Sequence, residues 1–418
     1  MGVMACPPSF HSKNGSQSES ANPHESESNF LLSLPRLKLV PSLTLQPPQQ
    51  QPSLSISNSN THHRFLTTLK GHNSPISSLT LAGKLLFTGS SDGEIRSWKR
   101  NPFQSESDPG SSTILNNLVA AGEGAVKSLV VQADKIFSAH QDHKIRVWRI
   151  NNNHETDHRN QKYTHLATLP TLGDRALKLL MPKNQVQIRR HKSCTWIHHV
   201  DAVSAVALSK DESFLYSVSW DRTLKIWRTK DFKCLESLTN AHDDAINALA
   251  LSNDGYVYTG SADRKIKVWK KNSGDQNKYS LVATQEQHNS GINALALSSD
   301  GSVLYSGASD RCILVWEKGG GSGGMEVVGA LTGHKNSILC LAVVSDLVCS
   351  GSADRTVRIW RRLSRNYNCL AVLDGHSGPV KCLTAAIDHH CNASEKAYLV
   401  YSGGLDCDIK VWQILVPS

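Results

Sequence analysis

The sequence predicts an all-β fold built from seven repeats, each a small antiparallel sheet. A Ser or Thr, an Asp four positions later and a Trp six positions after the Asp recur seven times, and seven of the nine tryptophans fall in this register. Scattered residues would not keep one register, so the chain contains an internal repeat. The copies begin at Thr88, Ser138, Ser217, Thr259, Ser306, Ser350 and Ser402.

Each repeat shows the same order of elements along the chain. An apolar run, such as residues 246–251, predicts a first strand, and a second strand ends at the Ser or Thr. A tight turn then holds the Asp. A run with period-2 alternation, such as residues 265–269 or 356–360, leads to the Trp. Its β-branched residues indicate that one face of this strand is buried.

A histidine opens six of the repeats, and we expect it to join a buried polar network. An Asp in a tight turn needs hydrogen-bond donors, which an imidazole, a hydroxyl and an indole can supply and relay. Removing one member would leave the others unpaired, at about 1–3 kcal/mol. The second repeat has Gly122 in place of the histidine and is predicted to be the loosest. The expected network residues are His72, Thr88, Asp92 and Trp98; His199, Ser217, Asp221 and Trp227; His242, Thr259, Asp263 and Trp269; His288, Ser306, Asp310 and Trp316; His334, Ser350, Asp354 and Trp360; and His376, Ser402, Asp406 and Trp412.

Over residues 64–418 these repeats resemble those of the WD40 family. The chain departs from that family's pattern after the closing Trp, where no repeat has Asp. The resemblance implies a seven-bladed β-propeller of four-stranded sheets around a channel, with the strand at residues 64–69 completing the last blade. The arrangement of the whole chain most resembles the plant JINGUBANG-type WD40 proteins, which implies a regulatory scaffold and not an enzyme.

The ends and composition narrow the possibilities further. Residues 1–63 are rich in Ser, Pro, Gln and Asn and are expected to be a disordered arm. Its basic and acidic residues balance, so the net charge of +9 belongs to the propeller. No run is long enough for a membrane span and no signal peptide is recognisable, so we expect a cytoplasmic or nuclear protein. The ten cysteines contain no CxxC pair and are expected to be reduced.

Three matches to catalytic motifs lie in the wrong setting. Residues 154–158 spell the HExxH of zinc proteases but lie in a polar loop, and that motif works only on a helix. Residues 89–93 and 320–324 spell GxSxG, yet the first is a turn between strands and the second a glycine tract. His389, His390 and Cys391 could bind a metal, but no fourth ligand lies nearby in the sequence. We therefore expect no enzymatic activity, no cofactor and no metal.

The basic insert at residues 170–198 is the main departure from the repeat. Successive closing tryptophans are 42 to 52 residues apart, but Trp148 and Trp227 are 79 apart. The insert is expected to overlie the face that carries the Asp turns, near Trp220. Two interpretations stay open: an acidic partner binds there, or Trp220 only packs against the insert. The candidate partner-binding residues are Trp220, Arg222, Arg175, Lys178, Arg189, Arg190 and Lys192.

The sequence thus predicts a monomeric, non-enzymatic scaffold for protein–protein interaction. A transcription factor or a signalling component is the candidate partner. One alternative is a substrate receptor of a cullin-type ubiquitin ligase, but Lys99 and Arg361 stand where that docking pattern needs Asp or Asn. Another is binding of RNA or acidic lipid through the insert. Nucleic acid is disfavoured, because six of the seven repeats carry a basic residue two positions before the Trp, and a position that follows the repeat indicates packing between blades.

Overall fold

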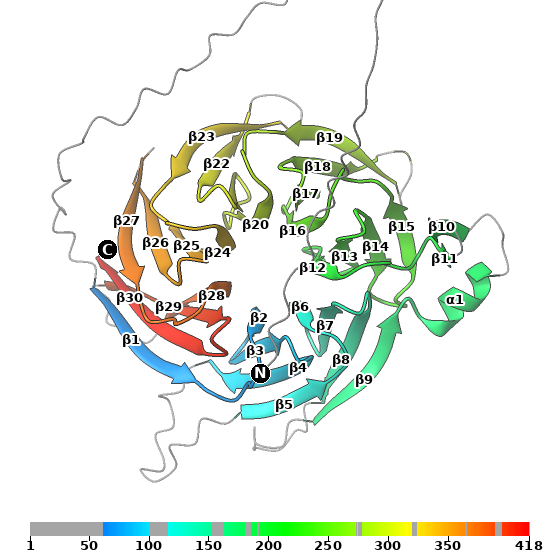
Figure 1. Cartoon of the computed structure of the whole chain (residues 1–418), viewed down its shortest axis with the longest axis horizontal. Helices are drawn as coiled ribbons and strands as arrows, with labels where there is room; N and C mark the ends of the chain where they lie inside the picture. The colour runs from blue at the N-terminus through cyan, green and yellow to red at the C-terminus, as the bar shows by residue number, and fades with distance from the viewer. Residues whose placement is uncertain are drawn as a thin grey trace, which may run out of the picture. The chain divides into compact units, whose positions relative to one another are not determined.

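The computed structural model describes residues 62–100, 116–151, 162–179, 185–189, 192–272, 274, 278–319, 324–363, 366–388 and 395–417. Within them, seven four-stranded antiparallel sheets stand around a central channel, so the predicted seven-bladed propeller is confirmed (Figure 1). The arm expected at residues 1–63 lies outside the described residues, apart from residues 62 and 63, which belong to a strand.

In every blade, four strands follow one another from the channel outward. Blade 1 contains β2 (Ile76–Ala82), β3 (Leu85–Ser90), β4 (Glu94–Lys99) and β5 (Asn116–Ala121). Blade 2 contains β6 (Val126–Gln132), β7 (Lys135–His140), β8 (Ile145–Asn151) and β9 (Lys162–Leu169). Blade 3 contains β12 (Val203–Leu208), β13 (Phe214–Ser219), β14 (Leu224–Arg228) and β15 (Cys234–Leu238). Blade 4 contains β16 (Ile246–Leu251), β17 (Tyr256–Ser261), β18 (Ile266–Lys271) and β19 (Tyr279–Gln285).

The remaining blades keep this order, and the last one takes its outer strand from the start of the chain. Blade 5 contains β20 (Ile292–Leu297), β21 (Val303–Ala308), β22 (Ile313–Lys318) and β23 (Met325–Leu331). Blade 6 contains β24 (Ile338–Val344), β25 (Leu347–Ser352), β26 (Val357–Leu363) and β27 (Asn366–Leu373). Blade 7 contains β28 (Val380–Asp388), β29 (Glu395–Gly404), β30 (Ile409–Pro417) and β1 (His62–Leu69).

The pairing of β1 with β30 closes the ring. The two strands run antiparallel from the pair of Leu69 with Ile409 to the pair of His62 with Leu415. The predicted closing strand is confirmed and is two residues longer than expected. The last blade is therefore held by hydrogen bonds between the two ends of the propeller sequence, and β30 is paired on both sides.

Apolar side chains fill the spaces between neighbouring blades. One buried cluster joins Val303 and Val315 of blade 5 to Ile338 and Trp360 of blade 6. Burying a Val, Leu or Ile side chain stabilises a fold by about 1.5–3 kcal/mol. The space is tight, because a Cβ added at Gly307 would lie 2.5 Å from Ile338 Cγ2. Small residues at this position therefore let the second strand of a blade approach the next blade.

Polar side chains on the inner strands also link neighbouring blades. Asn247 Nδ2 donates to the carbonyl oxygen of Ile292 over 2.9 Å, and Asn293 Nδ2 donates to that of Ile338 over 2.8 Å. Ser204 Oγ donates across the preceding interface over 2.5 Å. These bonds satisfy carbonyl groups next to the channel and fix the register between adjacent sheets.

Most of the described insert lies outside the ring, at the outer edge of blade 3 beside β15 (Figure 1). This part contains α1 (Leu172–Leu179) and a two-stranded sheet of β10 (Gln185–Arg189) and β11 (Lys192–Thr195). The buried Asp174 accepts the backbone N–H of Cys234 in β15 over 3.3 Å. The expectation that the insert covers the face of the Asp turns is wrong for α1 and this small sheet. The end of the insert is anchored further inside, where Ile197 is buried in the core and Lys225 of β14 donates to the carbonyl oxygen of Trp196.

Candidate functional site

Five blades carry one hydrogen-bond chain that runs from the Trp to the Asp. In blade 5, the indole N–H of Trp316 donates to Ser306 Oγ over 2.7 Å, and His288 Nε2 lies 2.7 Å from the same oxygen. His288 Nδ1 lies 2.9 Å from Asp310 Oδ2, which also accepts the backbone N–H of Asn289. With the proton on Nδ1, the hydroxyl donates to Nε2 and every polar atom of the chain is paired.

The other four blades repeat this geometry with distances of 2.7 to 3.0 Å between the side chains. The residues are His199, Ser217, Asp221 and Trp227 in blade 3; His242, Thr259, Asp263 and Trp269 in blade 4; His334, Ser350, Asp354 and Trp360 in blade 6; and His376, Ser402, Asp406 and Trp412 in blade 7. The repetition in five places is that of a structural element.

Burial sets the charge states in these networks. Burial lowers the pKa of His199, His334 and His376, although a carboxylate lies beside each ring. Burial would raise the pKa of the Asp263 carboxyl, but hydrogen bonding and charge attraction from His242 and two backbone N–H groups outweigh it and lower that pKa to about 2. At neutral pH the aspartate is therefore an anion whose acceptors are already occupied.

Blade 2 also has a network histidine, but this residue lies in the second strand of the blade and not in the connection before the inner strand. His140 is fully buried in β7, with Nε2 2.8 Å from Ser138 Oγ and Nδ1 3.1 Å from the carbonyl oxygen of Gly124. Side chains two residues apart on a strand share a face, so His140 reaches the same hydroxyl that Trp148 bonds. The basis for expecting the loosest blade here is therefore removed. Asp142 instead accepts two bonds from the guanidinium of Arg146.

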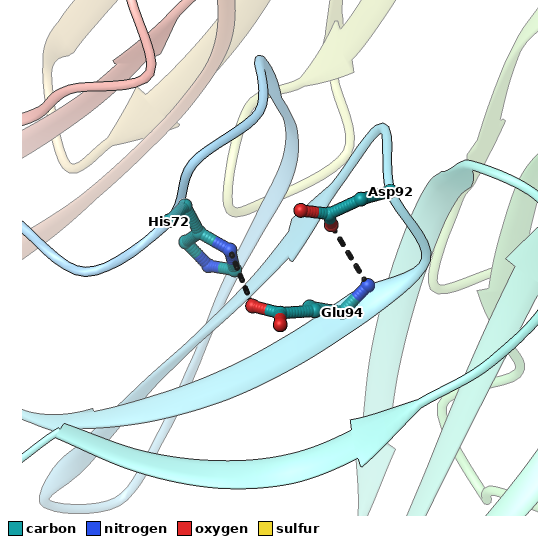
Figure 2. Close-up of side chains that lie close together, drawn as sticks. All are labelled: His72, Asp92 and Glu94. Atoms are coloured by element: carbon teal, nitrogen blue, oxygen red, sulfur yellow. Dashed lines mark hydrogen bonds and ion pairs between the residues drawn. The ribbon is translucent and has the colours of Figure 1, made fainter.

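Blade 1 departs from the expected network in the opposite way, because Asp92 accepts from the Glu94 backbone and not from His72 (Figure 2). His72 Nε2 lies 2.7 Å from Thr88 Oγ1, and Trp98 Nε1 donates to the same oxygen over 2.9 Å. Asp92, however, is exposed and accepts bonds from Ser90 and from the backbone N–H of Glu94, not from His72. The expected His72–Asp92 bond is thus absent, because the short Ser90 side chain holds the carboxylate within its own turn.

The residue after each Asp turns the chain back toward the third strand. It has a left-handed conformation in all seven blades, with φ between +65° and +85°. Gly and Asn favour this conformation, yet blades 3 to 6 place an arginine there. All four residues are exposed, and their guanidinium groups form no hydrogen bond or ion pair with other described residues. They are Arg222, Arg264, Arg311 and Arg355.

These arginines lie on one face of the propeller, which we call the turn face. It carries the turns between the second and third strands of every blade and the connections from each outer strand to the next inner strand. Sequence reasoning singled out Arg222 but missed the other three. The signal was available, since an Arg directly follows the Asp in four successive repeats.

Trp220 extends the turn face toward blade 2. Its side chain is 39% exposed, and Lys127 Nζ of the inner strand β6 lies 5.2 Å from its ring centroid. Burial and the charge of Lys381, on the inner strand of blade 7, lower the pKa of Lys127. The structure therefore brings Trp220 together with a basic residue near the channel that sequence reasoning missed.

The insert bases are only partly described. Arg175 Nε donates to the carbonyl oxygen of Pro170 over 2.9 Å, so this guanidinium helps to shape the start of α1. The side chains of Lys178, Arg189, Arg190 and Lys192 lie outside what the structure describes. Residues 154–158 and 389–391 also lie outside the described residues. No helix in the described part of the chain is both long enough and apolar enough to cross a membrane.

Comparison with known proteins identifies the repeat. The model of the family "WD domain, G-beta repeat" matches residues 63–99, 191–228, 232–270, 279–317, 325–361 and 367–413, which is more than half of the chain. No matched segment covers blade 2, where His140 replaces the usual histidine.

Curated relatives share the repeat at modest identity. The ribosome biogenesis protein YTM1 of Eremothecium gossypii is 25% identical over 289 residues, which cover 66% of this chain and 52% of that protein. Autophagy-related protein 16 of Arabidopsis thaliana is 24% identical over 285 residues, covering 64% and 53%. The ribosome biogenesis protein WDR12 homolog of Trichoplax adhaerens is 25% identical over 249 residues, covering 53% and 54%. The chain thus spans about half the length of these relatives.

A solved structure supports the fold alone. The WD40 β-propeller domain of Doa1 superposes with a TM-score of 0.59 at 19% identity, covering 84% of this chain and 97% of that domain. A shared fold does not define a shared activity. With the family model, the seven blades and the recurring His, Ser/Thr, Asp and Trp, the chain belongs to the WD40 repeat family.

Proposed function

We propose that this protein is a non-enzymatic interaction platform whose turn face binds an acidic segment of a partner protein. The observation that carries the proposal is the set of four exposed arginines at equivalent turns of blades 3 to 6 (Arg222, Arg264, Arg311 and Arg355). A guanidinium presents a rigid fork of donors that matches a carboxylate or a phosphate. Four such groups on consecutive blades suit an extended acidic segment.

The backbone makes these arginines informative. A residue other than Gly costs about 1–2 kcal/mol in the left-handed conformation. The backbone N–H of each arginine bonds within its turn, which any residue could do, but no described partner holds the side chain. The neighbouring carboxylate does not explain them, because in each turn it already accepts bonds from a histidine and the backbone, as Asp263 does from His242 and Asp243. An exposed, unpaired cation at an unfavourable backbone position supports a role outside the fold.

Trp220 supplies an apolar contact at one end of this row. Tryptophan and arginine are enriched among the residues that dominate binding energy at protein interfaces. The ring is partly exposed and lies against Lys127, so an approaching segment meets an aromatic surface and several cations together. The insert bases Lys178, Arg189, Arg190 and Lys192 are a second candidate binding region, as the sequence suggests.

The finer features of the function rest on resemblance. Likeness to the JINGUBANG-type proteins supports a regulatory role in the cytoplasm or nucleus, with a transcription regulator as partner. The curated relatives carry names from ribosome biogenesis and from autophagy. Such different names support a common platform and do not favour one pathway for this chain.

The test removes the four charges without straining the turns. A variant with Asn in place of Arg222, Arg264, Arg311 and Arg355 keeps the left-handed conformation, which Asn tolerates well. The matched control replaces four exposed lysines of the opposite face by Asn and changes the charge equally. These are Lys99, Lys210, Lys230 and Lys396.

Affinity purification with mass spectrometry should then compare the wild type and both variants at equal protein stability. We expect partners with acidic segments to be lost from the arginine variant and kept by the lysine variant. A third variant, with Gln at Arg189, Arg190 and Lys192, tests the insert as the alternative site. Equal partner profiles for the wild type and the arginine variant would refute the proposal, and recovery mainly of RNA would replace the protein partner by nucleic acid.

A further inference from the structure

The network of blade 1 leaves one buried ring nitrogen, Nδ1 of His72, without a hydrogen-bond partner in the described part of the chain. His72 is 6% exposed, and its Nδ1 forms no hydrogen bond with any described atom. The equivalent nitrogen bonds an aspartate in blades 3 to 7 and a carbonyl oxygen in blade 2, at Gly124. A buried polar atom without a partner destabilises a fold unless something outside the network satisfies it.

Two carboxylates lie in front of that nitrogen (Figure 2). Glu94 Oε2 is 3.8 Å from His72 Nδ1, and Asp92 faces the same space from the turn before β4. One ligand atom from each of the three side chains lies within 4.8 Å of the other two. Asp92 is exposed and Glu94 is half-buried, so an ion can enter from solvent.

We propose that His72, Asp92 and Glu94 bind a divalent transition-metal cation, with Zn²⁺ as the best-matched ion. An imidazole nitrogen with two carboxylate oxygens is a ligand set that suits Zn²⁺, whereas Mg²⁺ and Ca²⁺ prefer oxygen alone. Water would complete the coordination. Zinc ligands at about 2.1 Å from the metal lie within roughly 3.5 Å of one another, so the two carboxylates must close in around the ion.

The hydrogen bonds of His72 are compatible with this role. When Nε2 carries the proton, it donates to Thr88 Oγ1, and the Nδ1 lone pair points toward the carboxylates. Thr88 then donates toward the carbonyl oxygen of Arg96, 3.5 Å away. Burial, followed by the charge of Arg96, lowers the pKa of His72 to about 4, so the imidazole is neutral at physiological pH. A neutral imidazole is the form that binds metals.

Arg96 is a positively charged group next to the proposed site, and its charge disfavours a bound cation. Its Nε and Nη2 both lie 2.9 Å from Glu94 Oε2. A bond of this kind from outside the metal site also orients the ligand. Because Oε2 is also the oxygen that lies 3.8 Å from His72 Nδ1, a metal bound through it would share it with Arg96. Two carboxylates against one guanidinium leave the site with a charge of −1 before the ion arrives, which favours a cation.

The position of the site suggests what the ion would do. His72 lies in the connection between β1, the closing strand of blade 7, and β2, the inner strand of blade 1. Asp92 and Glu94 belong to the turn and third strand of blade 1. A cation held by all three would therefore tie the ring closure to the first blade and stabilise the folded ring.

The experiment uses the full-length protein after removal of metals with a chelator. Zn²⁺ titration by calorimetry, thermal unfolding with Zn²⁺ or Mg²⁺, and the visible absorption of Co²⁺ are measured for the wild type, Asp92→Asn and Glu94→Gln. Asp142→Asn is the matched control, because this aspartate has the same place in blade 2 but bonds Arg146 and not a histidine.

We expect Zn²⁺ to raise the Tm of the wild type and of Asp142→Asn, and Mg²⁺ to have little effect. Asp92→Asn and Glu94→Gln should weaken Zn²⁺ binding by more than about tenfold, since even losing an outer hydrogen bond to a metal ligand costs about 10–100-fold. If Asp92→Asn does not fold, Glu94→Gln decides alone. Unchanged binding in the folded variants, an equal response to Mg²⁺, or no Zn²⁺ response of the wild type would overturn the proposal.

Discussion

Replacing His140 by Ala tests whether this histidine does for blade 2 what the opening histidines do elsewhere. The side chain is fully buried, and its two ring nitrogens contact Ser138 Oγ and the carbonyl oxygen of Gly124. The substitution leaves the carbonyl oxygen without its partner, and the hydroxyl keeps the indole N–H of Trp148 and the carbonyl oxygen of Arg146 but loses the ring nitrogen. Each buried polar group left unsatisfied costs about 1–3 kcal/mol.

We therefore expect His140→Ala to lower the free energy of unfolding by about 2–4 kcal/mol. A change of 1 kcal/mol shifts the Tm of a 150–250-residue domain by about 2–4 °C and that of a larger unit by less, so a fall of about 4–8 °C is expected. Circular dichroism and calorimetry measure the Tm, and urea unfolding gives an independent midpoint.

His143 provides the control in the same blade. It is exposed and has φ of +68°, so His143→Asn should leave the Tm nearly unchanged. Equal Tm values for His140→Ala and the wild type would refute the assignment of His140 to the network. Blade 2 would then have no histidine that stabilises its network, as expected from Gly122 in the place of the opening histidine.

Three further predictions concern pH, packing and the insert. Burial lowers the pKa of His140 to about 4 in the folded state, whereas the same imidazole in the unfolded chain has a pKa near 6.5. The contribution of His140 to stability should therefore be constant above pH 6.5 and fall toward pH 4. Urea midpoints measured at several pH values should show a smaller fall in His140→Ala than in the wild type. Gly307→Ala should destabilise the protein by about 1–3 kcal/mol, because the added Cβ would lie 2.5 Å from Ile338 of the next blade. Gly329→Ala is the control, since a Cβ there has nothing within 4 Å. Equal Tm values for the two variants would contradict the packing argument. The buried Lys225 Nζ donates to the carbonyl oxygen of Trp196 in the insert over 2.6 Å and to Ser237 Oγ of β15 over 2.5 Å. Lys225→Met should therefore lower the free energy of unfolding in urea by about 1–3 kcal/mol. An equal loss in the exposed Lys230→Met would show that the lost charge alone is responsible.

The sequence could predict the blades because each one is encoded locally. Ser306, Asp310 and Trp316 lie within eleven residues, and their spacing follows from strand geometry. Ser306 lies near the end of β21, Asp310 lies in the turn, and Trp316 of β22 pairs with Leu304, two residues before the Ser. Seven copies of one local pattern give seven equivalent sheets. The arginine row of the turn face and the cluster of His72, Asp92 and Glu94 were not predicted, because the predictions rested on what the repeats share and not on how single repeats differ.

What the sequence alone determined was the number of blades, the closing strand and the residue types of the networks, since these depend on contacts within about one repeat. Only the tertiary structure decided which atoms meet. It gave blade 2 its histidine from β7, bonded Asp92 to Ser90 and not to His72, and anchored the insert on β15 through Asp174. Such contacts depend on rotamers and on distances between strands, so a repeat pattern cannot specify them even when it specifies every strand.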